Sequence, residues 1–146
     1  MNAIEKFGAY QKARELFDLV VEDLSTLQGE FSLGRLISQQ IASADSICAN
    51  IEEGYGRLSR QEYICFLDFA RGSARETRGR YLRMHHWLGA DIIDKRVRLL
   101  DEIIGILTAA ITTLKRQTTS PPNSSTLREE PEIYESDPLD TRHLPQ

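Results

Sequence analysis

Four segments of this 146-residue chain repeat their apolar residues at alternating spacings of three and four. They cover residues 7–28, 32–55, 60–88 and 91–117. This spacing places the apolar side chains on one face of an α-helix and is typical of helices packed side by side. Short connections between the segments favour an all-α fold, an antiparallel up-down-up-down four-helix bundle over residues 1–117. A three-helix arrangement with a swapped fourth helix is the alternative.

The connection between the second and third segments, residues 50–62, has the most specific local chemistry. Gly54 and Gly56 stand where a helix can stop, and we expect the left-handed conformation that such glycines often take. Ser59 and Glu62 have the spacing of a capping box, which predicts the start of the next helix. Two further carboxylates, at positions 52 and 53, lie near a predicted helix C-terminus, which disfavours them. They are therefore either solvated surface acids or partners of a cation, Arg57 or Arg60.

Three aromatic residues of the third segment, Phe66, Phe69 and Trp87, fall outside its main apolar face. They indicate a second apolar face, which would belong to a wide core or to a contact between subunits. Gly72 lies inside the same segment, where glycine costs about 1 kcal/mol relative to alanine. Close packing against a neighbouring helix would offset that cost.

The pattern ends after Gln117. Residues 118–146 begin with a polar, proline-containing stretch and carry six acidic residues against two basic ones. Such a composition buries too little apolar surface to offset the entropy of ordering, so we expect an acidic, disordered C-terminal tail containing Pro, Ser and Thr.

We expect a cytoplasmic protein without a membrane segment. No run approaches the roughly 18 apolar residues of a transmembrane helix, and the first residues lack the layout of a signal peptide. Cys48 and Cys65 are the two cysteines, and both fall at or beside apolar helical positions. We expect both to behave as small buried hydrophobic residues, without a disulfide.

Positive charge gathers in residues 57–98, which carry ten basic against five acidic residues, whereas residues 1–56 carry four against nine. Arginine suits phosphate because its forked donors match phosphate oxygens. The candidate nucleic-acid-binding residues lie in the third and fourth segments: Arg71, Arg75, Arg78, Arg80, Arg83, Lys95, Arg96 and Arg98. The alternative is structural pairing of these cations with acids of the first segment, namely Glu15, Asp18 and Glu22.

Catalytic and metal-binding motifs are not recognisable in this sequence, so we expect a protein that is not an enzyme and has no cofactor. His85 and His86 are adjacent, and adjacent side chains on a helix point about 100° apart, unlike a chelating i, i+4 pair. The Glu-x-x-His pairs of di-iron bundles, phosphate loops and nucleophile elbows are also missing.

The sequence resembles a bacterial family of small four-helix bundle proteins, some of them encoded by intervening sequences within large-subunit ribosomal RNA genes. The resemblance covers about residues 5–117. It rests in part on Gln11-Lys12-Ala13, Ser46-Ile47, Phe66-Leu67 and Gly72-Ser73 with Glu76. Its main evidence is the connection at residues 50–62. The motif residues there are Asn50, Glu53, Gly54, Tyr55, Gly56, Arg57, Ser59 and Glu62. The same family resembles the accessory proteins of diversity-generating retroelements.

The resemblance implies a non-enzymatic bundle that assembles into a ring-like homo-oligomer, often a pentamer. For the retroelement branch it implies binding of RNA or DNA and of a reverse transcriptase. Four positions depart from the family pattern: Tyr10 replaces tryptophan, Cys48 proline, Ala49 serine and Glu52 alanine. The acidic tail has no counterpart in the pattern.

Overall fold

The computed structural model describes residues 2–119, and this part of the chain is entirely helical, without a β-strand. Its four long helices are α1 (Gly8–Ser25), α2 (Gly34–Tyr55), α3 (Arg60–Arg83) and α4 (Ala90–Thr119). Three single 3-10 turns accompany them: η1 (Ile4–Lys6) before α1, η2 (Phe31–Leu33) before α2 and η3 (Met84–His86) after α3. The expected four-helix content is confirmed.

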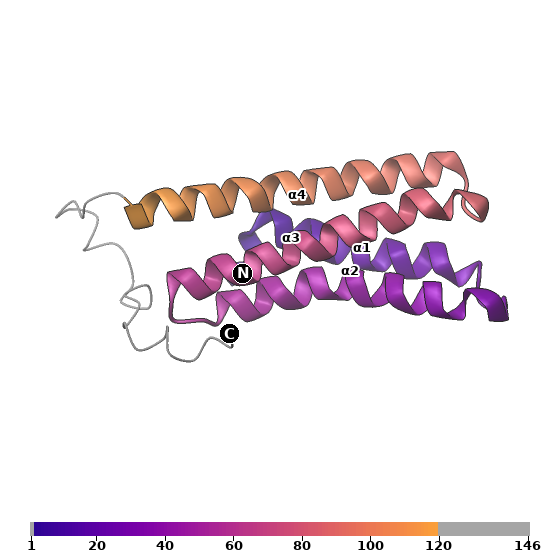
Figure 1. Cartoon of the computed structure of the whole chain (residues 1–146), viewed down its shortest axis with the longest axis horizontal. Helices are drawn as coiled ribbons and strands as arrows, with labels where there is room; N and C mark the ends of the chain where they lie inside the picture. Colours follow the sequence, from indigo (N-terminus) through magenta and orange to yellow (C-terminus); the bar gives the residue numbers. More distant parts are fainter. Residues whose placement is uncertain (1, 120–146) are drawn as a thin grey trace.

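The four long helices lie side by side along one common axis (Figure 1). Helix α2 packs along α3, α3 along α4, and α1 along both α2 and α4. Each helix therefore covers one side of a shared interior, as expected for a bundle whose helices each carry one apolar face.

The interior is built from the apolar positions that the spacing predicted. Leu24, Ile51, Leu67, Tyr81 and Leu107 are fully buried, and each lies at a position of the three-and-four spacing. Some positions differ from the prediction: Tyr55, which ends the spacing of the second segment, is 40% exposed, and Ile103, outside the spacing of the fourth, is fully buried. Small residues occupy the middle of the bundle, where Ala44, Ala70 and Ala74 are also fully buried. Small side chains at these positions allow the backbones of α2 and α3 to approach closely.

The ends of the helices differ from the sequence prediction in three places. Helix α3 ends at Arg83 rather than near residue 88, because the backbone tightens into η3, where the Trp87 amide donates to the Met84 carbonyl oxygen three positions back at 3.0 Å. Helix α4 begins at Ala90, so Asp91 lies in its first turn instead of capping it, and it continues to Thr119. Helix α1 ends at Ser25 rather than near residue 28, and Gly29, with φ of 104°, lies in the turn that follows.

The aromatic residues outside the main face of the third segment do not widen the core. Phe69 is 56% exposed and Trp87 is 44% exposed, and only Phe66 is half-buried. The wide-core interpretation is therefore wrong for Phe69 and Trp87, whose rings lie on the surface.

Among the described residues, no helix is both long and apolar enough to cross a membrane. The predicted acidic tail lies outside the described residues, except for Thr118 and Thr119, which complete the last turn of α4.

Candidate nucleic-acid interface

The connection between α2 and α3 is a compact turn, but its glycines act differently from the prediction. Helix α2 continues through Gly54 to Tyr55, and neither Gly54 nor Gly56 has a positive φ. Gly54 is buried instead, and a Cβ built on it would lie 2.8 Å from Phe66 Cβ and 3.0 Å from Tyr63 Cδ2. Glycine is therefore needed at position 54 because α3 approaches too closely for a side chain.

The predicted start of α3 is confirmed. Ser59 is the residue before the helix, and its hydroxyl oxygen accepts a hydrogen bond from the Glu62 amide at 3.3 Å. Arg57 forms an ion pair with Glu53, lies 4.0 Å from the Glu62 carboxylate and places its guanidinium over the Phe66 ring. One of the two acids at the end of α2 thus has the cationic partner that the sequence indicated.

Two of the positions that depart from the family pattern contact each other. The Tyr10 hydroxyl of α1 donates to the Glu52 carboxylate of α2 at 2.8 Å, and this bond raises the pKa of Tyr10. Asn50, another motif residue, donates to the Ser46 carbonyl oxygen within α2 at 2.8 Å. The residues of this connection therefore hold helices together, and their described contacts are structural.

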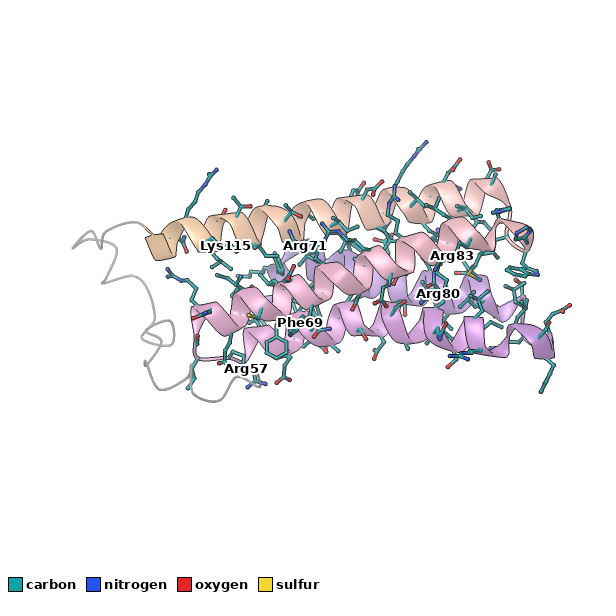
Figure 2. All side chains as sticks on the ribbon, in the orientation of Figure 1. Arg57, Phe69, Arg71, Arg80, Arg83 and Lys115 are labelled. Carbon is teal, nitrogen blue, oxygen red and sulfur yellow. The ribbon has the colours of Figure 1, made fainter. Side chains whose placement is uncertain are left out.

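Three of the eight candidate cations, Arg71, Arg78 and Arg96, are neutralised by acids of the bundle. Arg71 donates to Asp68 at 2.7 Å and to the Thr108 hydroxyl of α4 at 3.3 Å, and it lies between α3 and α4 (Figure 2). Arg78 donates to Asp101 of α4 at 2.7 Å. The contacts of these first two arginines join α3 to α4 and leave less positive charge for a partner.

Arg96 is the candidate that forms a bidentate ion pair with a buried carboxylate. Its Nε and Nη2 donate to the two oxygens of Asp23 at 2.8 and 2.9 Å, and the Tyr81 hydroxyl donates to the same carboxylate at 2.7 Å. Burial and the neighbouring carboxylate raise the pKa of Tyr81, so its hydroxyl keeps its proton. Arg96 therefore joins α4 to α1 and is unsuitable for contact with nucleic acid.

Arg80 is held by neutral groups. Its Nη1 donates to the Gln40 side-chain oxygen and the Ser43 hydroxyl, both at 2.9 Å, and to the Gln39 carbonyl oxygen at 3.4 Å. Burial lowers the pKa of Arg80, while Glu76 opposes that shift without forming an ion pair. Arginine remains charged in proteins, so this guanidinium is a cation without a bound carboxylate.

The remaining four candidates, Arg75, Arg83, Lys95 and Arg98, are exposed and form no ion pair or hydrogen bond within residues 2–119. Lys95 and Arg98 each follow an acidic residue by four positions on α4, a spacing at which opposite charges attract on a helix surface. Arg75 and Arg83 have no acidic residue three or four positions away on α3. Arg80 follows Glu76 by the same four positions, and this carboxylate opposes the lowering of its pKa without forming an ion pair. Arg75 and Arg83 are therefore the candidates with least compensation, followed by Arg80.

Pairing with first-helix acids occurs in part, through a residue that the sequence did not single out. Asp23 makes the contact with Arg96, and Lys12 of the same helix pairs with Glu102 of α4. The predicted acids Glu15, Asp18 and Glu22 form no ion pair in the part described. Asp23 could have been noticed because it lies three positions after Val20 and seven after Leu16, on the same buried face of the helix.

The two histidines and the two cysteines also differ from the expectation. The rings of His85 and His86, both in the 3-10 turn η3, lie 4.0 Å apart rather than pointing away from each other. Residues 2–119 hold no group of three metal-ligating side chains.

Both cysteines are free of disulfide bonds. Cys48 is partly buried, whereas Cys65 is exposed, so the prediction of a buried thiol is wrong for Cys65.

Comparison with known protein families places most of the chain in one of them. Residues 5–109 match the family model described as 23S rRNA-intervening sequence protein. A search of curated proteins finds no significant match.

Proposed function

The chain belongs to the 23S rRNA-intervening sequence protein family, and from this premise we propose that it is a non-enzymatic binding module for RNA or DNA. The observation that carries the proposal is the group Arg75, Arg80 and Arg83 along α3, which lacks carboxylate partners within residues 2–119. Surface cations that no protein acid neutralises bind phosphate and release counterions.

Binding measured against salt concentration tests this function. The full chain is titrated into a labelled oligonucleotide, single-stranded or duplex, at several salt concentrations. We expect affinity to fall as salt rises and to drop further in the double variant Arg75→Glu, Arg83→Glu. The double variant Arg71→Gln, Arg78→Gln is the matched control, because those two side chains are already paired with acids. Absence of binding to any nucleic acid at low salt would contradict the proposal.

We also infer that the chain acts as a homo-oligomer, with a ring favoured and a pentamer as its expected size. Support comes from large apolar side chains at the surface, including Leu58, Phe69 and Leu82, which are 67, 56 and 46% exposed. Exposed apolar groups of this kind favour association. Light scattering coupled to size exclusion measures the subunit number, and Phe69→Ser is expected to shift it toward the monomer.

A second candidate function is a purely structural or regulatory homo-oligomer whose arginines serve only as ion-pair partners. The observation that favours it is the internal pairing of Arg71, Arg78 and Arg96. It predicts that the unaltered chain binds no nucleic acid and that its oligomer persists in the double variant Arg75→Glu, Arg83→Glu. A reverse transcriptase as protein partner is supported by the resemblance to retroelement accessory proteins alone.

We infer that consecutive helices alternate in direction, as in an antiparallel up-down-up-down bundle. The start of α1 contacts the end of α2 through Tyr10 and Glu52. Helices α2 and α3 meet through Gln40 and Thr77, and the end of α1 meets the start of α4 through Asp23 and Arg96. Short connections between such neighbours support the same arrangement.

A further inference from the structure

Only one of the three guanidinium nitrogens of Arg80 takes part in hydrogen bonds with the bundle. All three of its hydrogen bonds are made by Nη1, and all three acceptors are neutral oxygens of α2. Its Nε and Nη2 have no hydrogen bond among the described residues and are not among the fully buried polar atoms, so each is at least partly accessible. These two nitrogens form the fork that binds two oxygens of one phosphate group.

The groups that hold Arg80 are themselves fixed by a buried polar network. Gln40 is fully buried, and its side-chain nitrogen donates to the Thr77 carbonyl oxygen at 3.0 Å. The Ser43 hydroxyl lies 2.8 Å from the Thr77 hydroxyl, which donates to the Ser73 carbonyl oxygen. A buried polar network with satisfied partners is rigid, so it fixes the direction of the arginine that it contacts.

Arg83 places a second cation one helical turn beyond Arg80. Both side chains lie on the part of α3 that leads toward α4 (Figure 2). Arg83 is exposed, forms no ion pair within residues 2–119, and lies close enough to lower the pKa of Arg80. Glu76 lies four positions before Arg80 and attracts it without forming an ion pair. Both arginines repel each other and lack a bound carboxylate within residues 2–119, an arrangement that favours an external anion.

Aromatic rings follow the two arginines. The rings of His85 and His86 lie 4.0 Å apart, and the His86 ring lies 5.5 Å from that of Trp87. All three residues are exposed, and Trp87 is 44% accessible. Trp87 follows Arg83 by four positions of sequence. Exposed rings near phosphate-binding cations stack on unpaired bases, which a duplex does not offer.

We propose that Arg80, Arg83 and Trp87 form a site for single-stranded nucleic acid at the end of α3, with Gln40, Ser43 and Thr77 as positioning residues. The arginines bind consecutive phosphates and the Trp87 ring stacks on a base. This inference rests on the proposed nucleic-acid function and adds to it the strand class and the location.

Trp87 reports on its own site, because it is the single tryptophan of the chain. The full chain is titrated with a single-stranded oligonucleotide, with the duplex of the same sequence and with inorganic phosphate, and tryptophan fluorescence is recorded. We expect saturable, salt-sensitive quenching by the single strand, weaker quenching by the duplex and none by millimolar phosphate. Quenching by phosphate at the same concentration as by the oligonucleotide would overturn the proposal in favour of a free-anion site.

Variants test whether Arg80, Arg83 and Trp87 contribute to binding more than other surface residues do. Affinity for a labelled single strand, measured by fluorescence polarisation, is expected to fall about tenfold or more in Arg80→Gln, Arg83→Gln and about tenfold in Trp87→Leu. The double variant is expected to reduce the salt slope of binding by about 0.7 for each phosphate that the protein no longer binds. Arg78→Gln, whose side chain is paired with Asp101, is the matched control and is expected to bind like the unaltered chain.

One further variant tests the site without disturbing the buried network. Gln39 is exposed, and its backbone carbonyl oxygen accepts a hydrogen bond from Arg80, so Gln39→Glu adds a negative charge to a surface residue that contacts Arg80 through its backbone. We expect weaker single-strand binding with unchanged thermal unfolding. Binding that survives both this variant and Arg80→Gln, Arg83→Gln, with no change in Trp87 fluorescence, overturns the site. Failure of every nucleic acid to bind would instead overturn the proposed function as a whole.

Discussion

The Arg96 guanidinium donates two parallel hydrogen bonds of 2.8 and 2.9 Å to the Asp23 carboxylate, which lies 73 positions earlier in the sequence. Both side chains are largely withdrawn from water, with 14 and 4% of their surfaces accessible. Removal of one partner leaves a buried charge without compensation. We expect Asp23→Ala to lower the free energy of unfolding by about 3–5 kcal/mol in urea. The exposed Lys12–Glu102 pair is the control, since Glu102→Ala should cost about 1 kcal/mol or less.

The close approach of α3 at Gly54 gives a second prediction. Gly54→Ala forces a methyl group to within 2.8 Å of Phe66 Cβ and should destabilise the fold by about 1–3 kcal/mol. Gly105 lies inside α4 with no heavy atom near its missing Cβ. Gly105→Ala should therefore stabilise the fold by about 1 kcal/mol through helix propensity. Equal effects of the two substitutions in thermal unfolding would contradict this account of Gly54.

The two cysteines should differ strongly in reactivity. Burial and the nearby carboxylate of Glu52 raise the pKa of Cys48 to about 11, whereas Cys65 is exposed. At pH 8 roughly one Cys48 thiol in a thousand is ionised, and the thiolate is the reactive form. Iodoacetamide followed by mass spectrometry should label Cys65 first and Cys48 only after unfolding. Faster labelling at Cys48, with Cys65→Ser as the control, would contradict this prediction.

The acidic tail should weaken nucleic-acid binding. Residues 118–146 carry six acidic against two basic residues, and their charge competes with phosphate for the same cations. Truncation after Gln117 is expected to tighten binding of a labelled oligonucleotide, with the largest gain at low salt. A full-length variant with the six acids changed to glutamine or asparagine distinguishes charge from length. Unchanged or weaker affinity in both proteins would contradict the prediction.

The apolar spacing predicted the core well because burial follows the helical period directly. Leu67, Ala74 and Tyr81 recur every seven positions, which places them on one face of a helix, and all three are fully buried. The cap at Ser59 was predictable because it depends on two residues three positions apart. Local rules of this kind need no knowledge of the neighbouring helices.

The behaviour of the arginines could not be predicted in the same way. Arg80 and Arg96 look alike in the sequence, yet one is held by neutral groups about 40 positions away and the other by a carboxylate 73 positions away. Gln40 and Asp23 occupy buried positions that apolar periodicity alone does not assign to polar side chains. Such pairings depend on which helices become neighbours, and that information lies outside any single segment.

The carboxylate of Asp23 also constrains how the chain can fold during synthesis. Its three hydrogen-bond donors belong to Tyr81 and Arg96, which emerge from the ribosome 58 and 73 residues later. A hairpin of α1 and α2 alone would have to bury this carboxylate unpaired or leave its end open to water. Stable packing of the helices at this end of the bundle therefore requires the first turns of α4. Fragments that end before Arg96 should leave the Asp23 end of α1 exposed to solvent.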